Sequence, residues 1–470
     1  DENATVYVYA RDNAGNISAA SEVVIDKITT NPDFLIAPQF YESDNLVGIY
    51  NPRRGSENML YKIGEDGEWR EYEVPFAIPF GQTVNVYAKF ESSCDYEISG
   101  SFTSNVAYAG AYGESNTDFT LSYKNIGFNF TRSYNSIDKK WHFATDSKVT
   151  PQNDYVIKSV MPDGSKLTFV KSAANTYTEE LNGYTLTVND GGYVINVDSV
   201  NYTYDNNGNI ISVGNKYGDT VNVARNDNNI IVSDKTGRAY TLTLNDNKNI
   251  ISVTDPADNS IQYTYDSDNN LTKVVDQAGV IIGQYEYKNG VLSKSMDKTV
   301  NYTADGRVQS YVYDSGAYLN YTYDDENKTI STVSSVETTS SQGFDDALLT
   351  VSSTDEDGKT TEYTYDNHYR KLSETADGKT VTYSYDSNGR LISEVSDDEN
   401  AENTYYTYDS NGNVVRQQTG KTYTYSVYND IGEVVLTASL KDGYSGEIPE
   451  IYNSDLTCFD TVNYTYDNGM

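Results

Sequence analysis

The two histidines are the first residues to weigh as catalysts, because few other side chains exchange protons near neutral pH. The chain has 470 residues and 2 histidines, His142 and His368. His142 lies in the segment KKWHFAT, which predicts a strand, and His368 lies in YDNHYRK, which predicts a turn. A Ser/His/Asp triad or a His-rich zinc site needs histidines that meet specific partners. We therefore predict no catalytic residues and no enzyme activity for this segment.

The abundant carboxylates could form a glycosidase-like pair or bind calcium. The best calcium candidate is DSDNN, with Asp266, Asp268 and Asn270 as ligands. Leu271, however, replaces the glycine that an EF-hand loop requires, and Gln277 replaces its bidentate glutamate. We expect at most adventitious or structural calcium there, and no other metal or cofactor.

Composition excludes several classes of partner. The chain carries 34 basic and 69 acidic residues, a net charge of −35. This charge disfavours nucleic acid and anionic membrane surfaces. An aromatic content of 13%, mostly its 45 tyrosines, argues against disorder. No apolar run predicts a membrane span or a signal peptide, and the chain reads as a piece of a longer protein. Cys94 and Cys458 are predicted to be unpaired thiols.

Many of the acidic residues belong to a repeated sequence element. One copy of this element is NYTYDNNGNIISV, at residues 201–213. Apolar positions after the turn recur about every 20 residues. They include Ile210, Ile230, Ile250, Leu271, Leu292, Leu372, Leu391, Val414 and Val434. Each unit alternates β-forming and polar residues around Asp, Asn and Gly, which predicts a strand, a tight turn and a strand. A fixed period of this length indicates a repeat protein.

Two turns are compatible with the repeat. A two-residue loop at Asn207–Gly208 would need positive φ at both residues. A type I turn over 205–208 would instead place Asp first and Gly fourth, with Gly208 in a left-handed bulge. The Asp-to-Gly spacing is the same at Asp386 and Asp409, which favours the second turn. The carboxylates are thus assigned to turns, where each caps its own backbone.

The bulged turn makes specific predictions. Positive φ is expected at Gly208, Gly389 and Gly412. Tyr204 should face Ile210 on one face of the sheet, and equivalent pairs are expected for Tyr385 with Leu391 and Tyr408 with Val414. The preceding tyrosines, Tyr202, Tyr383 and Tyr406, should lie on the same face. Because a single hairpin is marginally stable, neighbouring hairpins must stabilise one another.

The repeats closely resemble the Rhs, or YD-repeat, family. The positions that carry the resemblance are Tyr202, Tyr204, Asp205, Gly208, Tyr263, Tyr265, Asp266, Tyr363, Tyr365, Asp366, Tyr383, Tyr385, Asp386, Gly389, Tyr406, Tyr408, Asp409 and Gly412. Upstream, the segment from 118 to 169 resembles the opening of bacterial Rhs shells. Its matching residues are Arg132, Tyr134, Asn135, Ser136 and Trp141. Units at 221–232 and 242–253 depart from the pattern by lacking the tyrosine pair.

This resemblance implies an antiparallel hairpin sheet that spirals into a hollow shell. Family members enclose a C-terminal toxin in bacterial polymorphic toxins, and teneurins form a closed barrel. The absence of the family's closing core motif favours an unclosed shell segment here. The effector domain of the same protein is the implied partner, without membrane insertion by this segment.

The N-terminal third carries a different pattern. Gly67, Trp69 and Tyr72 before the strand VNVYAKF resemble bacterial Ig-like surface modules. We therefore expect an all-β chain with the end of an Ig-like module at 1–30 and an Ig-like β-sandwich at 31–110. A shell-opening segment at 111–200 and a YD-repeat shell at 201–470 should follow. The stretch from 104 to 117 is predicted to be a linker.

Two functions remain open, and a wall-degrading enzyme is a third that the sequence favours less. By resemblance, the chain is a secreted or cell-surface bacterial protein, associated with the cell wall, that encloses or displays a toxin used against neighbouring cells. Alternatively, it is an adhesin whose tyrosines stack on cell-wall or host glycans. Packing between repeats explains the tyrosine rows more simply than sugar binding does.

Overall fold

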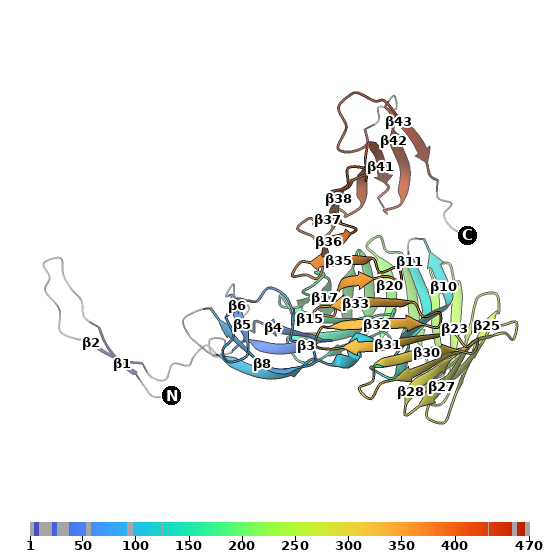
Figure 1. Ribbon diagram of the computed structural model, residues 1–470, viewed down its shortest axis with the longest axis horizontal. Helices are drawn as coiled ribbons and strands as arrows, with labels where there is room; N and C mark the ends of the chain where they lie inside the picture. Colours follow the sequence, from blue (N-terminus) through green and yellow to red (C-terminus); the bar gives the residue numbers. More distant parts are fainter. Residues whose placement is uncertain are drawn as a thin grey trace. The chain divides into compact units, whose positions relative to one another are not determined.

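The fold was analysed in a computed structural model, which describes residues 4–8, 21–25, 37–52, 58–91, 97–124, 126–430, 432–453 and 458–465. The described residues form strands, turns and two short 3-10 helices, so the predicted all-β class is confirmed (Figure 1). No helix among them has the length and apolarity to cross a bilayer. Cys94 lies outside the described residues.

The chain divides into two compact units. One consists of Asp1–Phe40, Ile49–Tyr72 and Asn85–Ser101, and the other of Tyr41–Gly48, Glu73–Val84 and Phe102–Met470.

Small antiparallel sheets make up the N-terminal part. β1 (Ala4–Val8) pairs with β2 (Ser21–Ile25). A three-stranded sheet has the order β3-β4-β7, and a four-stranded sheet has the order β6-β5-β8-β9. Their bounds are β3 (Gln39–Ser43), β4 (Leu46–Tyr50), β5 (Met59–Ile63), β6 (Arg70–Glu71), β7 (Phe76–Ala77), β8 (Thr83–Phe90) and β9 (Ile98–Thr103). An Ig-like relationship stays a prediction, as do the four domain boundaries.

The predicted linker over 104–117 is wrong. It contains η2 (Val106–Gly110) and the start of β10 (Gly113–Tyr123). Tyr112 is 1% exposed, and its ring lies 6.2 Å from that of Tyr134 and 6.0 Å from that of Tyr311. The glycines and serines of this stretch suggested a linker, but its aromatic side chain is buried between strands. β10 then pairs with β11 (Ile126–Asn135), which pairs with β12 (Lys140–Phe143).

From Lys148 onward, 31 strands form one sheet in which each strand pairs with its sequence neighbours. After η3 (Ala144–Asp146), the first strands are β13 (Lys148–Pro151), β14 (Val156–Val160), β15 (Lys166–Lys171), β16 (Thr176–Thr178), β17 (Thr185–Asn189), β18 (Gly192–Val197), β19 (Val200–Tyr204), β20 (Ile210–Asn215), β21 (Thr220–Arg225), β22 (Asn229–Asp234), β23 (Ala239–Leu244), β24 (Ile250–Thr254), β25 (Ser260–Tyr265), β26 (Leu271–Val275), β27 (Ile281–Lys288) and β28 (Val291–Ser295). The sheet continues with β29 (Lys298–Tyr302), β30 (Val308–Tyr313), β31 (Tyr318–Asp324), β32 (Thr329–Ser334), β33 (Thr339–Phe344), β34 (Thr350–Thr354), β35 (Thr360–Tyr365), β36 (Lys371–Ala376), β37 (Lys379–Tyr385), β38 (Leu391–Ser396), β39 (Thr404–Tyr408), β40 (Val414–Thr419), β41 (Thr422–Tyr428), β42 (Val434–Leu440) and β43 (Phe459–Asn463).

The bulged type I turn is confirmed. In the first repeat, the Gly208 N–H donates to the Asp205 carbonyl, and the Asp205 N–H donates to the Asn209 carbonyl. The φ angles of Gly208, Gly389 and Gly412 are 77°, 78° and 88°. The register pairs Tyr204 with Ile210, Tyr385 with Leu391 and Tyr408 with Val414, each beside a register shift.

One member of the apolar period, Leu372, lies at the bulge and does not face a tyrosine. Tyr365 pairs with Lys371, so Leu372 is the extra residue of the bulge and is exposed. The apolar period alone cannot separate the two bulge positions, because they are adjacent and only one faces the tyrosine.

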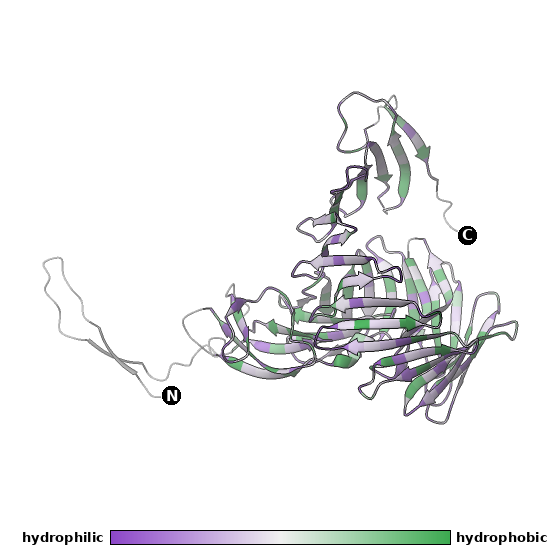
Figure 2. Ribbon diagram, viewed as in Figure 1, coloured by the Kyte–Doolittle hydropathy of each residue, from purple (hydrophilic) through white to green (hydrophobic). Residues whose placement is uncertain are grey.

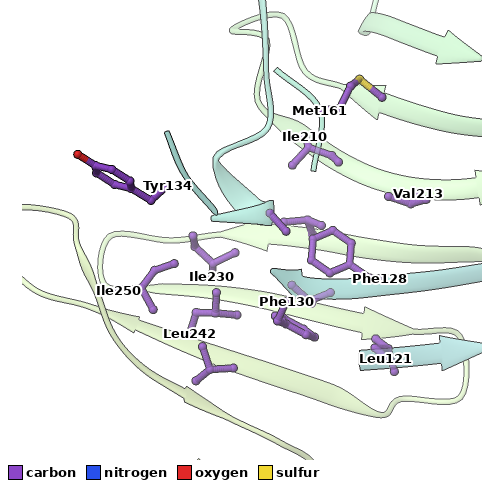
Figure 3. Packing of buried hydrophobic residues seen from close by; sticks show 14 of the residues in the cluster. Leu121, Phe128, Phe130, Tyr134, Met161, Ile210, Val213, Ile230, Leu242 and Ile250 are labelled. Atoms are coloured by element: carbon purple, nitrogen blue, oxygen red, sulfur yellow. The ribbon is translucent and has the colours of Figure 1, made fainter. Parts of the chain in front are cut away.

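The main core lies between β10–β11 and the tyrosine-bearing face of the large sheet. Hydrophobic and hydrophilic residues alternate along many strands (Figure 2), and in β22 every second residue is buried. Phe128 and Phe130 of β11 lie among Ile230, Leu242 and other aliphatic residues of the sheet (Figure 3). A small separate cluster near the C-terminus contains Tyr425, Ala438 and Phe459.

Candidate functional site

The predicted shell-opening residues come together where β11 and β12 lie on the large sheet. Alternate residues of β11 are buried, and Arg132 and Tyr134 belong to that buried row. Pairing of the two strands places Tyr134 opposite Trp141. The site is therefore built by a short two-strand element that presents Arg, Tyr and Trp to the sheet.

Arg132 is the centre of a buried polar network. Its Nε donates to both carboxylate oxygens of Asp118 on β10, at 3.1 and 3.0 Å, and the Arg132 side chain is 1% exposed. Its Nη1 donates to the Tyr285 hydroxyl. Tyr263 donates its hydroxyl to Asp118 Oδ2 at 2.7 Å. The network thus joins β10 and β11 to strands that lie about 150 residues later in the chain.

Electrostatics favour the charged pair inside this network. Burial by itself would lower the pKa of Arg132, but the charge of Asp118 and the contact with Tyr285 raise it overall. Burial, followed by the Asp118 charge, raises the pKa of Tyr263 well above its ordinary value. Tyr263 therefore stays protonated and donates to the carboxylate. The charged pair and the protonated hydroxyl together suit a structural role.

The remaining opening residues also bind the sheet or the chain beside it. The Leu292 N–H donates to the Tyr134 hydroxyl at 2.9 Å, and Trp141 Nε1 donates to the Tyr287 hydroxyl at 2.7 Å. Ser136 Oγ accepts from the Tyr112 N–H at 2.9 Å. In contrast, Asn135 accepts from the N–H of residue 137 and so shapes its own turn.

A row of tyrosine hydroxyls connects successive hairpins, and the repeat spacing did not predict it. The second tyrosine of a repeat donates to the backbone carbonyl at the start of the return strand of the preceding hairpin. The distance from hydroxyl oxygen to carbonyl oxygen is 2.7–2.9 Å in every pair. The pairs are Tyr265–Ile250, Tyr287–Leu271, Tyr302–Leu292, Tyr323–Val308, Tyr365–Thr350, Tyr385–Lys371, Tyr408–Leu391 and Tyr428–Val414.

The hydroxyl row has a physical reason in the register. The ladder between β24 and β25 ends at the pair of Ser252 with Gln262, on the side away from the turn that joins the two strands, so it does not reach Ile250. Tyr265 then supplies the hydrogen bond that the Ile250 carbonyl lacks in the ladder. Phenylalanine could fill the same space but could not donate. This requirement explains why the repeat uses tyrosine at that position.

A repeat without tyrosine solves the same problem differently. The unit at 221–232 has Arg225 near the position of the second tyrosine. Its guanidinium donates to the Ile210 carbonyl of the preceding hairpin and to the Thr145 carbonyl. The departure from the repeat pattern therefore retains a hydrogen bond between hairpins.

The repeat aspartates act on their own turns. Asp266 Oδ1 accepts from the N–H groups of Asp268 and Asn270, and its Oδ2 accepts from the Asn270 side chain. Equivalent bonds occur at Asp205, Asp366, Asp386 and Asp409. Among the described residues, no three or more His, Cys, Asp or Glu side chains are grouped to hold a metal. Calcium at the DSDNN turn stays an untested prediction.

The histidines occupy separate places. His142 pairs with Ser133 across β11 and β12, and its Nε2 lies 3.6 Å from an Asp138 oxygen. His368 lies in a turn, with its Nδ1 2.9 Å from Asn367 Oδ1. These contacts do not assemble a nucleophile, a base and an orienting acid among the residues described here.

Comparison with solved structures finds structures of TcdB2-TccC3 and of a Tc holotoxin pore. The crystal structure of TcdB2-TccC3 is 11% identical, with 98% of this chain and 30% of that chain covered and a TM-score of 0.29. A structure of the Photorhabdus luminescens Tc holotoxin pore is 12% identical, with 82% and 25% covered and a TM-score of 0.28. This chain therefore spans less than a third of those chains. No curated protein matches the sequence significantly.

The model of the RHS Repeat family matches residues 245–281 and 371–402. These two segments contain the turns at Asp266 and Asp386 and the hydroxyl contacts of Tyr265 and Tyr385. The matched segments and the hairpins around them have the same kind of turn and the same kind of hydroxyl contact. These two segments of the chain thus match the RHS Repeat family.

Proposed function

We propose that this chain forms part of the wall of a hollow Rhs shell that encloses or displays a C-terminal effector of the same protein. The effector is proposed to be a toxin used against neighbouring cells. The wall itself has a structural role and carries out no chemistry. The protein acts outside the cytoplasm, secreted or held at a bacterial cell surface.

The proposal depends mainly on how the tyrosine-bearing face changes along the sheet. The apolar residues of this face in the main core are buried as far as Val308, below β10 and β11. From β31 to β40 the repeat tyrosines of the same face are only half-buried, including Tyr363, Tyr383 and Tyr406. A continuous wall whose lining is partly free supports a function in holding another polypeptide.

The cations over the tyrosine rings argue against the glycan-binding alternative. The Lys371 ammonium lies 4.4 Å from the ring centre of Tyr383, and the Arg390 guanidinium lies 4.5 Å from that of Tyr408. A sugar stacking on these faces would have to displace the cations. The same cations stabilise neighbouring repeats, so the arrangement supports the structural function over the adhesin.

Limited proteolysis of the complete gene product tests the proposal. The segment downstream of the repeats should resist protease while the sheet is folded, and should be cut once urea unfolds the sheet. Cutting of that segment in the native protein at the rate of the unenclosed segment would contradict enclosure. Specific, saturable binding of this chain to a glycan array would support the adhesin instead.

A further inference from the structure

The first strand of the large sheet, β13, also contacts the turn between β19 and β20. The Val149 N–H donates to the Gly208 carbonyl at 2.8 Å, and the Ile210 N–H donates to the Ser147 carbonyl at 3.4 Å. Gly208 suits this close approach, because a Cβ at that position would meet the Val149 carbonyl. The backbone of β13 is thus held on a hairpin that comes much later in the chain.

Lys148 and Asn209 face each other between these two backbone bonds. They form an antiparallel bridge of the kind that exchanges no hydrogen bond within the pair, in which the two side chains come closest together. Lys148 Nζ donates to Asn209 Oδ1 at 2.8 Å, across 61 residues, and both residues are half-buried. The amine nitrogen of Lys148 therefore touches the carboxamide group of Asn209.

A carboxylate contacts the other side of the same carboxamide. Asn209 Nδ2 donates to Asp205 Oδ1 at 3.3 Å and to Asp205 Oδ2 at 3.1 Å. Burial by itself would raise the pKa of Asp205, but hydrogen bonds from its turn and the charge of Lys148 lower that pKa overall. Asp205 is therefore ionised at neutral pH and can accept a proton. The three side chains supply an amine, a carboxamide and a proton carrier.

Other turns of the sheet contain only part of this arrangement. Asn413 Nδ2 donates to Asp409 Oδ2 at 2.9 Å, but within the described ranges no lysine donates to that asparagine. Lys216 Nζ donates to Asn411 Oδ1 at 3.0 Å, where both residues are exposed and no carboxylate of the described chain accepts from the amide. The Asp–Asn bond is therefore a property of the turn, and the half-buried lysine distinguishes Asn209.

We propose that Lys148 and Asn209 form an amide bond between their side chains, with Asp205 as the proton carrier. The Lys148 ammonium gives one proton to the Asp205 carboxylate, and the electron pair of Nζ then forms a bond to Asn209 Cγ. The carbonyl π electrons move to Oδ1. The Asp205 carboxyl group passes its proton to Nδ2, and the Cγ–Nδ2 bond breaks as the carbonyl forms again. The second proton from Nζ goes to the departing ammonia, which leaves as ammonium. One amide replaces another, so the step is redox-neutral and uses no further reactant.

The amide fastens one end of the sheet. β13 is the first strand in the order of the large sheet and has β14 as its neighbour there. A strand in that position can separate by local opening more easily than a central strand. A covalent link across 61 residues prevents separation of β13 alone and also restricts the unfolded chain. Opening at this end then requires the intervening strands to unfold as well.

Mass spectrometry of the full chain tests the proposal. The intact protein should be lighter than its sequence by one ammonia molecule, and a digest should contain one branched peptide that joins the segments around Lys148 and Asn209. Lys148→Arg keeps the positive charge but removes the attacking amine, so both signals should disappear. A succinimide at Asn207–Gly208 would also release ammonia, but hydroxylamine cleaves a succinimide and leaves the proposed amide intact.

A matched pair of variants tests the proton carrier. Asp205→Asn can still accept the N–H groups of its turn but cannot carry the proton, so the branched peptide should form about a hundredfold more slowly after refolding. Asp409→Asn makes the same change in a turn without a lysine and should leave that rate unchanged.

Three results would overturn the proposal. The first is a folded protein that keeps its full sequence mass and yields no branched peptide after prolonged incubation. The second is formation of the branched peptide at the same rate in the chain unfolded in urea, because the folded geometry would then have no part in it. The third is an unchanged rate in Asp205→Asn, which would remove Asp205 from the step. None of these results depends on enclosure of an effector.

Discussion

The buried pair of Asp118 and Arg132 predicts a large and strongly coupled loss of stability when it is broken. Each charge is almost completely enclosed, with side-chain exposures of 3% and 1%. Removing one partner leaves the other as a buried charge, which costs about 3–5 kcal/mol. We therefore expect Arg132→Met or Asp118→Asn alone to lower the free energy of unfolding by that amount.

The double variant separates this explanation from simple loss of packing. With both charges gone, no unpaired ion stays buried, and the amide oxygen that Asp118→Asn introduces can still accept from Tyr263. The double variant should lose about as much as one single variant. Because the double variant loses one single-variant amount and not two, the cycle should give a coupling energy of about 3–5 kcal/mol.

Tryptophan fluorescence during urea unfolding can follow this region selectively. The chain has 2 tryptophans, and Trp141 lies 5.6 Å from the Arg132 guanidinium. A Trp69→Phe background makes Trp141 the reporter. The surface pair of Lys294 and Asp314, at 30% and 61% exposure, is the control. Breaking that pair should cost about 0–1 kcal/mol.

Two results would refute the reasoning. The first is a loss below about 1 kcal/mol for Arg132→Met, which would equal the surface control. The second is additivity of the two single variants, which would mean that the charges act independently. Either result would leave the network without a role in joining β10 and β11 to the sheet.

Three further predictions concern the repeats. Tyr385→Phe should lower the free energy of unfolding in urea by about 1 kcal/mol, because the carbonyl that accepts from Tyr385 loses its donor. Tyr405→Phe, at an exposed site, should lower it little. Equal losses in the two variants would contradict the role of the hydroxyl row. Gly208→Ala should destabilise the protein more than Gly279→Ala. Both glycines have positive φ, but only a Cβ added at Gly208 would meet the backbone of β13. A thermal scan that ranks the two variants equally would contradict this. Burial would raise the pKa of Asp386, but hydrogen bonds from its turn lower that pKa overall. The contribution of Asp386 to the free energy of unfolding should therefore persist above about pH 4 and fall in more acid solution. A urea midpoint that is unchanged down to about pH 2.5 would contradict this.

The local part of the fold could be predicted because its causes lie within one repeat. The spacing from Asp205 to Gly208 determines a bulged turn, and the bulge determines that Tyr204 faces Ile210. The apolar period alone does not indicate which of two adjacent bulge positions faces the tyrosine, as at Leu372, which is the extra residue of its bulge. Period and composition thus predict the hairpin, while the choice between bulge positions needs the register.

The site could be predicted only in part because its partners are far apart in sequence. The opening motif identified Arg132, Tyr134 and Trp141, but its carboxylate, Asp118, resembles many other acidic residues. Tyr285 lies 153 residues from Arg132 along the chain, and no local spacing indicates that contact. The available signal was the apolar alternation of residues 126–134, in which Arg132 occupies a position of the buried row. A buried charge requires a partner, so this position indicated an acidic residue in contact with Arg132.

The two kinds of tyrosine contact suggest how the sheet can be both continuous and tolerant of sequence change. The hydroxyl row acts between adjacent hairpins and requires a donor of suitable length, which Arg225 can replace. The Asp118–Arg132 network instead joins strands far apart in sequence and admits few substitutes. Repeats can therefore diverge individually, as Arg225 and Leu244 at the second-tyrosine position show, whereas change in the network removes the attachment of β10 and β11 at once. Stability of the wall should accordingly be distributed along the repeats but concentrated at the opening.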